Sequence, residues 1–507
     1  MLARTFTATM VGLHAKIIEV EVDTLRGMPI LVFIGLPSKA VEEAKERLTS
    51  ALLHCQVRLQ HKRTVINLAP ADLPKHGSSF DLAIAAALLQ ANHELTFPSD
   101  QYLLFGELAL DGRIKPMAGV LPLVLAARAK GYAHVCVPAA NVAEVETVRG
   151  ISIHPLTHLQ EFIRAWRSPT QHLPVLAARS YAQSPHLGAP TRDPFADIIG
   201  QTEGKRACTI AAAGGHHVLL TGPPGVGKSS LARALAAAQP PLTEMESLEV
   251  TQIYSLLGLN YGQLLRDRPF RAPHHTVSTS GLLGGGPKLL PGELSLSHHG
   301  VLFLDEFLEL APSCLEALRQ PLEERVVTLT KGSGHVQYPA AFTLIAATNP
   351  CPCGFRWSTT RQCRCSLNQQ ERYQQKLSGP LVDRFDVVVL VGEVGHAEVS
   401  QRLRREAAPP SQNWQREILF ARERQRDRWR RTGYALNANA PSALLRARCP
   451  LTRPAQQLLD QAYIAHQLSL RGYTKIWRVA QTIADLAGHE SIQEEDIAEA
   501  VMYRLKA

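Results

Sequence analysis

A short segment of the chain combines closely spaced glycines with a lysine and two serines. It consists of Gly222, Pro223, Pro224, Gly225, Val226, Gly227, Lys228, Ser229 and Ser230. Glycines allow successive backbone N–H groups to turn inward around phosphate oxygens, because no Cβ blocks the approach. In such a loop the lysine supplies a positive charge to the β- and γ-phosphates, and the adjacent serine offers a hydroxyl to Mg²⁺. The segment therefore predicts a site for a nucleoside triphosphate and Mg²⁺.

Two adjacent carboxylates, Asp305 and Glu306, follow the apolar run 301–304. A buried parallel strand that ends in carboxylates places them at the sheet edge where such sheets bind ligands. We expect Asp305 to hold Mg²⁺ through water and Glu306 to act as general base on the attacking water. A third apolar run, 342–347, leads to Asn349, whose amide would orient the same water. Together these features predict a P-loop ATPase.

The residues that flank the phosphate loop predict the strand and the helix that would position it. Residues 218–220 are apolar and residues 231–238 favour a helix, which is the strand–loop–helix order that a phosphate loop requires. Residues 194–393 therefore predict an α/β ATPase core. The first 165 residues also have α/β texture, with apolar runs at 17–22, 30–34 and 65–68 and helical patterns at 39–53 and 81–89.

Two further segments complete this division of the chain. Residues 166–193 lose periodicity and are rich in Pro, Ser and His, which predicts a linker. Residues 394–507 carry almost no strand signal and several amphipathic helical stretches, such as 454–468 and 474–487. At about 150 residues per domain, a chain of 507 residues is expected to hold roughly three domains.

The composition narrows the class of protein. Hydrophobic residues make up 45% and charged residues 20%, which excludes disorder over most of the length. A net charge of +9 permits a polyanionic partner without requiring one. The longest uncharged apolar stretch, 118–127, is too short for a membrane span, and Lys16, Glu19 and Glu21 interrupt any secretory segment. Nine cysteines in a chain this long do not indicate a disulfide framework, so we expect a cytoplasmic protein with no membrane partner.

Four of the cysteines lie close together, at Cys351, Cys353, Cys363 and Cys365. Zn²⁺ prefers four tetrahedral thiolates, and two cysteine pairs joined by a loop can supply them. We therefore favour a structural Zn²⁺ site in this segment, the cysteine knob (351–365), over the alternative of free or redox-active thiols. The knob also carries the aromatic and basic residues Phe355, Arg356, Trp357, Arg361 and Arg364. These suit contact with DNA, and a purely structural knob is an equal alternative.

The order of the motifs resembles the AAA+ superfamily of ring ATPases. The resemblance places Asn349 at the position called sensor 1, and Arg384 at the arginine finger that reaches the γ-phosphate of a neighbouring subunit. It implies a closed ring, since each site is then completed by the next protomer. A surface ion pair is the alternative for Arg384. Arg471 and Arg478 share one helix face, and both are candidates for the nucleotide-sensing sensor 2 arginine, with Arg471 fitting the spacing better.

A closer resemblance lies in the segments 268–276, 284–286 and 291–300. They are similar to the magnesium-chelatase-like branch of AAA+ proteins and most closely to the YifB/ComM family, over essentially the whole chain. That family implies a hexameric, ATP-driven DNA helicase that promotes branch migration while incoming single-stranded DNA is integrated in natural transformation. It also implies a helix-2 insert and a β-hairpin that point into the ring pore.

The resemblance also defines the expected partners. DNA that is single-stranded, forked or branched is the expected substrate and a homo-hexamer the expected assembly, with recombination proteins as potential partners. The phosphate loop, the carboxylates and the cysteine cluster make ATP, Mg²⁺ and structural Zn²⁺ the expected cofactors. Lys288, Lys331 and His335 are the candidate DNA contacts in the pore, the last two in a strand–turn–strand pattern. A solvated turn is the alternative for Lys331. The competing hypothesis for the whole chain is a chelatase-like motor that remodels a protein partner.

The N-terminal region resembles the Lon-protease-like (S5 domain 2-like) fold in the segments 75–81 and 106–119. Ser79 falls at the nucleophile, but the position of the catalytic lysine falls on Leu123, which cannot abstract a proton. We therefore expect no protease activity and a turn or helix-cap role for Ser79. The expected fold class is α/β: a Lon-protease-like domain (1–165), a linker, an AAA+ P-loop core (194–393) with the helix-2 insert, and a C-terminal α-helical lid (394–507). DNA loading and ring organisation are both open as roles of the first domain.

An arginine-rich stretch in the expected lid contains Arg422, Arg424, Arg426, Arg428, Arg430 and Arg431. Helical spacing puts Arg422, Arg426 and Arg430 on one face, where they would suit phosphate contacts. We favour the alternative of a solvated face or ion pairs between subunits for this stretch.

Overall fold

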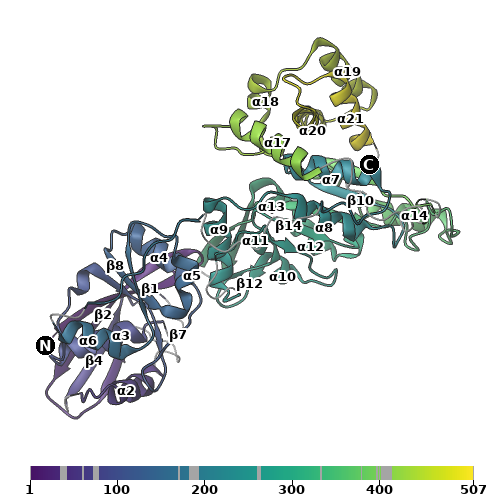
Figure 1. The fold of residues 1–507 in the computed structure, drawn as a ribbon. Coiled ribbons are helices and arrows are strands. Elements are labelled where there is room, and N and C mark those ends of the chain that lie inside the picture. The colour runs from purple at the N-terminus through teal and green to yellow at the C-terminus, as the bar shows by residue number, and fades with distance from the viewer. Residues whose placement is uncertain are drawn as a thin grey trace.

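The structure is a computed structural model, and it describes residues 2–34, 43–59, 62–71, 73, 79–168, 172–181, 193–259, 264–331, 334–377, 379–395, 398, 400 and 414–505. The elements are arranged as an elongated row (Figure 1). The N-terminal α/β unit lies at one end of the row, a second α/β unit in the middle and a helical unit at the C-terminal end.

The first unit contains two main sheets. A four-stranded mixed sheet has the order β1 (Leu2–Val11), β2 (His14–Leu25), β4 (Arg63–Ala69), β3 (Leu31–Ile34). A three-stranded parallel sheet follows as β5 (Tyr102–Leu104), β8 (His134–Pro138), β9 (Ser152–Leu156). The short strands β6 (Glu107–Leu108) and β7 (Ile114–Lys115) pair with each other. The helices of this unit are α2 (Ala44–His54), α3 (Asp81–Ala91), α4 (Val120–Ala129), α5 (Val142–Val145) and α6 (Leu159–Arg167).

These elements agree with the predicted strands and with the predicted helix at 81–89. The helix expected over 39–53 appears as α2, and residues 39–42 lie outside the described residues. Nearly every side chain of α3 is buried, because the helix packs on β1 and β2 and carries mainly alanine and leucine.

The second unit is built on a five-stranded parallel sheet. Its order is β11 (Phe270–Arg271), β14 (Val301–Leu304), β17 (Thr343–Thr348), β10 (Val218–Thr221), β18 (Val387–Leu390). Successive residues of the central strands point to opposite faces of the sheet and enter different cores. Val218 and Leu220 of β10 pack with α7 (Thr202–Gly214), α8 (Lys228–Ala238) and the C-terminal helices. Leu219 packs in the core on the opposite face. Burial on both faces explains why these strands are continuous apolar runs.

Two hairpins of this unit lie outside its five-stranded sheet. The first joins β12 (Gly284–Gly285) to β13 (Leu290–Pro291), with Lys288 exposed in the connecting turn. The second joins β15 (Val326–Lys331) to β16 (Gly334–Pro339). Lys331 pairs with Gly334, and Thr330 pairs with His335, so the predicted strand–turn–strand pattern is confirmed and both candidate residues lie near its tip. This unit also contains the helices α9 (Glu244–Leu256), α10 (Thr279–Leu283), α11 (Glu293–Leu296), α12 (Pro312–Ala317) and α13 (Arg319–Glu324).

The first unit contacts the second through the turn between β1 and β2. Gly12 in that turn has φ +64°, and a Cβ on it would lie 2.3 Å from Cγ1 of Val336 in β16. The backbone N–H of Gly119, just before α4, donates to the Ser255 carbonyl of α9 at 2.8 Å. The N-terminal unit therefore rests directly on the longer hairpin and on α9.

The third unit is helical. Its helices are α17 (Trp414–Arg428), α18 (Ser442–Arg448), α19 (Arg453–Ala465), α20 (Leu470–Ala487) and α21 (Glu494–Leu505). The buried carboxylate of Asp485 lies at its centre and accepts hydrogen bonds from Arg428 (2.7 Å), Asn437 (2.9 Å) and Gln481 (3.1 Å). Among the residues described, no helix is long and apolar enough to cross a membrane.

The prediction of a solvated face or of ion pairs between subunits is wrong for three arginines of the arginine-rich stretch, which contact other residues of the same chain. Arg422 donates to the Ala212 carbonyl of α7, Arg424 donates to the His489 carbonyl, and Arg428 pairs with Asp485. These guanidiniums join α17 to the rest of the same chain, because the helix packs between α7 and α20. Arg426 and Arg430 are exposed.

Asp485→Ala should lower the free energy of unfolding by about 3 kcal/mol, because it leaves the Arg428 guanidinium buried without its charge partner. Urea denaturation followed by circular dichroism measures this loss. Asp427→Ala, an exposed carboxylate on the same helix α17, is the matched control and should change stability by less than about 0.5 kcal/mol. Equal stability of the two variants would contradict the central role of Asp485.

Candidate functional site

The carboxyl edge of the parallel sheet gathers the predicted phosphate-binding groups. Register pairs Thr221 with Thr348, and Leu304 with Ala346, so β10, β14 and β17 end close to one another. The hydroxyl of Ser229, at the start of α8, consequently donates to a carboxylate oxygen of Asp305 at 3.1 Å. The two residues expected to hold Mg²⁺ therefore lie side by side, although one follows β10 and the other β14.

The glycines of the phosphate loop serve two different purposes. Gly225 and Gly227 have φ values of +81° and +95°, and a Cβ on either would meet nothing within 4 Å. Their surroundings are open, and their backbone conformation is one that glycine adopts without strain. Gly222, in contrast, is needed for close packing, since a Cβ there would lie 2.1 Å from the Val391 carbonyl oxygen. The remaining predicted loop residues, Pro223, Pro224, Val226 and Ser230, complete the turn and the first turn of α8.

Lys228 is held against the loop and against the end of β17. Its Nζ donates to the carbonyls of Gly222 (2.6 Å) and Pro223 (2.8 Å) and to Oδ1 of Asn349 (3.1 Å). Burial lowers the pKa of Lys228 to about 8, while the nearby Asp305 and Glu306 act in the opposite direction. The structure thus joins the predicted lysine and the predicted sensor 1 asparagine in one contact.

Glu306 has a partner that the sequence analysis did not identify. Its Oε2 lies 2.8 Å from Nδ1 of His275, and its own backbone has φ +48°. His275 follows β11, the edge strand beside β14, so it reaches the same carboxyl edge. The available signal was a pair of histidines shortly after a strand: His275 lies four residues beyond the end of β11, whereas Asp305 follows β14 directly.

The arginines predicted to sense nucleotide lie at the opposite, amino edge of the sheet. Arg384, Arg471 and Arg478 line one cavity of about 680 Å³. The cavity also contains His217 and Asp386, which immediately precede β10 and β18. A four-residue strand spans on the order of 10 Å, so these arginines are separated from the phosphate loop of their own chain by the full depth of the sheet.

Within the cavity, charges are unequally matched. Arg384 pairs with Glu323 at 2.5 Å, and Arg471 pairs with the same carboxylate oxygen. Arg478 donates its Nε to the Ala440 carbonyl at 2.9 Å. Arg325, which the sequence analysis missed, also lines the cavity, and burial with the proximity of Arg478 lowers its pKa. An excess of guanidinium groups in a partly closed cavity favours an anion supplied from outside the chain.

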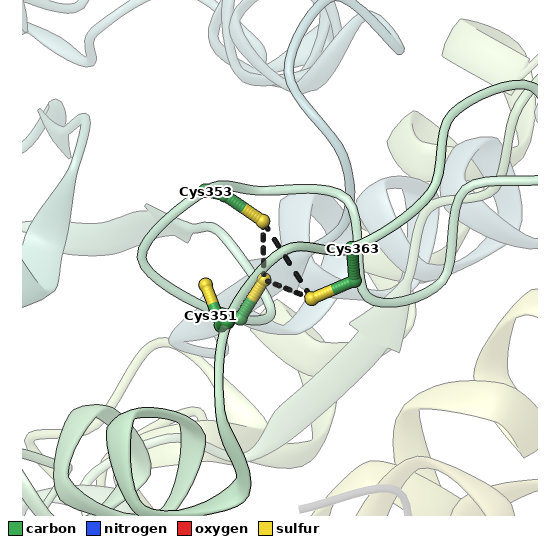
Figure 2. Close-up of side chains that lie close together, drawn as sticks. Cys351, Cys353 and Cys363 are labelled. Carbon is green, nitrogen blue, oxygen red and sulfur yellow. Dashed lines mark hydrogen bonds between the residues drawn. The ribbon is translucent and has the colours of Figure 1, made fainter.

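The four cysteines of the knob converge. The three Sγ···Sγ distances among Cys351, Cys353 and Cys363 are 3.4, 3.7 and 3.6 Å, and all four Sγ atoms, Cys365 included, lie within 4.8 Å of one another (Figure 2). A tetrahedron with Zn–S bonds of about 2.3 Å has edges of about 3.8 Å, whereas a disulfide requires about 2.05 Å. The backbone N–H of Phe355 lowers the pKa of Cys353 to about 6, while burial raises that of Cys351 to about 12. The donor set fits a single metal ion bound by four thiolates.

A second group of potential metal ligands does not fit a metal. His298 and His299 both reach Oε2 of Glu249, at 3.2 and 2.6 Å. However, Nδ1 of His298 accepts the backbone N–H of Ala341 at 3.0 Å. A neutral imidazole that accepts at Nδ1 carries its proton on Nε2, so this Nε2 donates to Glu249 and has no lone pair for a metal. The group is a hydrogen-bonded cluster that ties α9 to the segment before β14.

The positions related to the Lon dyad are also described. Ser79 lies in the turn before α3, where its carbonyl accepts the N–H of Gly106. Leu123 is buried in the apolar core around α4, so no base occupies that position. The lysines on either side of this position lie elsewhere. Lys115 pairs with Glu107 on β6, and Lys130 is exposed at the end of α4.

Comparisons with known proteins agree with this architecture. Three family models match: magnesium chelatase subunit ChlI over residues 194–399, a further model of the ChlI subunit over 20–141, and the ChlI C-terminal model over 408–504. The chain is 36% identical to the competence protein ComM of Haemophilus influenzae over 99% of its own length and 97% of that protein.

Two further relatives extend the comparison. The protein YifB of Escherichia coli is 37% identical over 98% of this chain and 96% of its own length. Lon protease 2 of Bacillus subtilis is 30% identical over 182 residues, or 31% of this chain and 33% of that enzyme. Because this similarity spans nearly the whole chain at 36–37% identity, the chain belongs to the YifB/ComM family of magnesium-chelatase-like AAA+ ATPases.

Proposed function

We propose that this protein is a ring-forming ATPase motor that translocates on DNA and promotes branch migration when single-stranded DNA is integrated, as in natural transformation. The observation that carries the proposal is the division of the site between two edges of one sheet. Ser229, Asp305 and Lys228 lie at the carboxyl edge, whereas Arg384 lies in the cavity at the amino edge. A second copy of the chain is then needed to complete each site.

This division supports a homo-oligomeric ring. If the cavity of one protomer faces the phosphate loop of the next, Arg384 and Arg471 would reach the neighbour's γ-phosphate, with Arg478 behind them. Head-to-tail contacts of this kind close into a ring, and a hexamer is the assembly that the family resemblance favours. An arginine supplied by a neighbour stabilises charge in the transition state.

Within one site, the residues of this chain have separate tasks. Bound Mg²⁺ would neutralise charge on the β- and γ-phosphates, held by Ser229 and through water by Asp305. Lys228 would exchange its bonds to loop carbonyls for phosphate oxygens. Glu306 would accept the proton of the attacking water, which Asn349 would orient.

The DNA part of the proposal rests on one relative and on the two hairpin tips. The Haemophilus influenzae relative is a competence protein. Lys288 is exposed in the β12–β13 turn, and His335 is exposed beside Lys331 near the tip of β15–β16. Basic side chains near a hairpin turn suit contact with passing phosphates. The alternative is that the same motor remodels a protein partner, which the match to magnesium chelatase subunits favours.

We also propose that the four thiolates of the cysteine knob hold a structural Zn²⁺. The Sγ···Sγ distances support this, since they approach the edge of a tetrahedral site. Tetrathiolate coordination also occurs in iron–sulfur clusters, but a cluster places several atoms between its cysteines and needs wider spacing than this one.

Single-stranded or forked DNA should stimulate the ATPase rate of the wild-type protein more strongly than a duplex does. Measurement of phosphate release against each DNA tests this, with Glu306→Gln as the blank, expected to lower the rate about 10²-fold or more because it removes the general base. If single-stranded, forked and duplex DNA all leave the ATPase rate at its value without DNA, the DNA motor is refuted and protein remodelling is favoured.

Arg384→Ala should assemble with the wild-type oligomeric state but hydrolyse ATP about 10³-fold more slowly. Mixing it with Lys228→Ala should restore part of the rate, because a Lys228→Ala protomer still supplies Arg384 to a neighbour with an intact phosphate loop. Size-exclusion chromatography and ATPase titrations over the mixing ratio measure both effects. If no mixture recovers activity, Arg384 does not act between subunits.

His275→Ala should lower the turnover number about tenfold with little change in ATP affinity, because the contact of His275 is with the carboxylate of Glu306, the proposed general base. His275→Asn keeps a hydrogen-bond donor and should retain more activity. Turnover and ATP affinity are measured separately, by phosphate release and by calorimetry. An unchanged turnover number in His275→Ala would show that the His275 contact does not position Glu306.

A further inference from the structure

The cysteine knob begins where β17 ends and crosses toward the end of β18. Cys351 follows Asn349 by two residues, at the carboxyl edge of the sheet. In the sheet order, β10 lies between β17 and β18. A segment that runs from the end of β17 to the end of β18 must therefore pass the end of β10, from which the phosphate loop starts.

One face of the knob touches the phosphate loop directly. Gly354 has φ +83°, and a Cβ on it would lie 2.8 Å from Cδ and 3.3 Å from Cγ of Pro224. The same imagined atom would lie 3.8 Å from the side-chain amide carbon of Asn349. The knob thus packs against the proline in the middle of the phosphate loop and against the asparagine that contacts Lys228.

The other side of the knob is fastened to the end of β18. The carboxylate of Glu393 accepts hydrogen bonds from the Ser358 hydroxyl (2.5 Å), from the N–H (2.9 Å) and hydroxyl (2.7 Å) of Thr359, and from the Thr360 hydroxyl (3.1 Å). These donors lower the pKa of Glu393 to about 2, so it remains a carboxylate across the working pH range.

Between these two attachments the knob has little apolar support. Cys351 is fully buried, but Trp357 is 42% exposed and the arginines 356, 361 and 364 are exposed. A loop without a core of its own depends on cross-links for its shape, and four bonds to one ion supply them.

We infer that the metal-bound cysteine knob clamps the phosphate loop, so that occupancy of the tetrathiolate site by an ion of the Zn²⁺ class sets the affinity for ATP. The metal holds Gly354 against Pro224, and the Glu393 contacts hold the far side of the knob over the end of β10. Loss of either support leaves the phosphate loop to be ordered by the nucleotide itself, and that ordering cost weakens binding. This inference rests on the proposed nucleotide and zinc sites.

The test measures zinc content, ATP affinity and helix content on the full-length protein. Zinc is determined by elemental analysis, ATP affinity by calorimetry and helix content by circular dichroism, before and after removal of the metal with a chelator and after readdition of Zn²⁺. The wild-type protein should hold one Zn²⁺ per chain. Removal should weaken ATP binding about tenfold at unchanged helix content, and readdition should restore it.

Two variants separate the clamp from the metal. Glu393→Ala should keep its zinc yet bind ATP about tenfold more weakly, because it releases the knob without removing a thiolate. Gln362→Ala, an exposed side chain of the same knob, should change neither quantity.

The possible outcomes are distinct. If the stripped protein or Glu393→Ala binds ATP as tightly as the zinc-loaded wild type, the clamp is overturned. Absence of stoichiometric zinc from the wild type overturns the metal site. Failure of the zinc-loaded wild type to bind ATP would instead refute the proposed function, and the clamp with it. If removal of the metal lowers the helix content, the ATP affinity of the zinc-loaded Glu393→Ala variant alone decides whether the clamp exists.

Discussion

Parallel pairing of β14, β17 and β10 is the constraint on which the rest of the structure depends. Because their carboxyl ends coincide, three segments separated along the chain meet at one edge and bring Ser229 to Asp305 and Lys228 to Asn349. The close approach of Gly222 to Val391 extends the same constraint to β18. A shift in this register would separate the hydroxyl from the carboxylate and the lysine from the amide.

The same parallel sheet places the arginines at its amino edge, on the side opposite the phosphate loop. Arg384 precedes β18, and α20 covers the amino edge with Arg471 and Arg478, so the cavity opens away from the phosphate loop. A single chain therefore carries the two halves of the proposed site on opposite sides of the sheet. Glu323 pairs with Arg384 and Arg471, and these ion pairs orient both guanidiniums within the chain that supplies them.

The N-terminal unit contacts both the longer hairpin and helix α9 of the second unit. Its β1–β2 turn rests on β16, and its α4 region is bonded to α9, which the His298–His299–Glu249 cluster ties to the segment before β14. The contact links the unit to the hairpin whose tip carries His335.

The sequence by itself determined the phosphate loop, the carboxylate pair, the cysteine cluster and the β15–β16 hairpin, because each depends on the spacing of neighbouring residues. The family resemblance added the arginine segment. Only the tertiary structure decided that Arg422, Arg424 and Arg428 are internal, that His275 meets Glu306, and that the cysteine knob packs on Pro224. These contacts join residues far apart in the chain, and their formation depends on which strands are neighbours and which faces are buried, which local spacing does not specify.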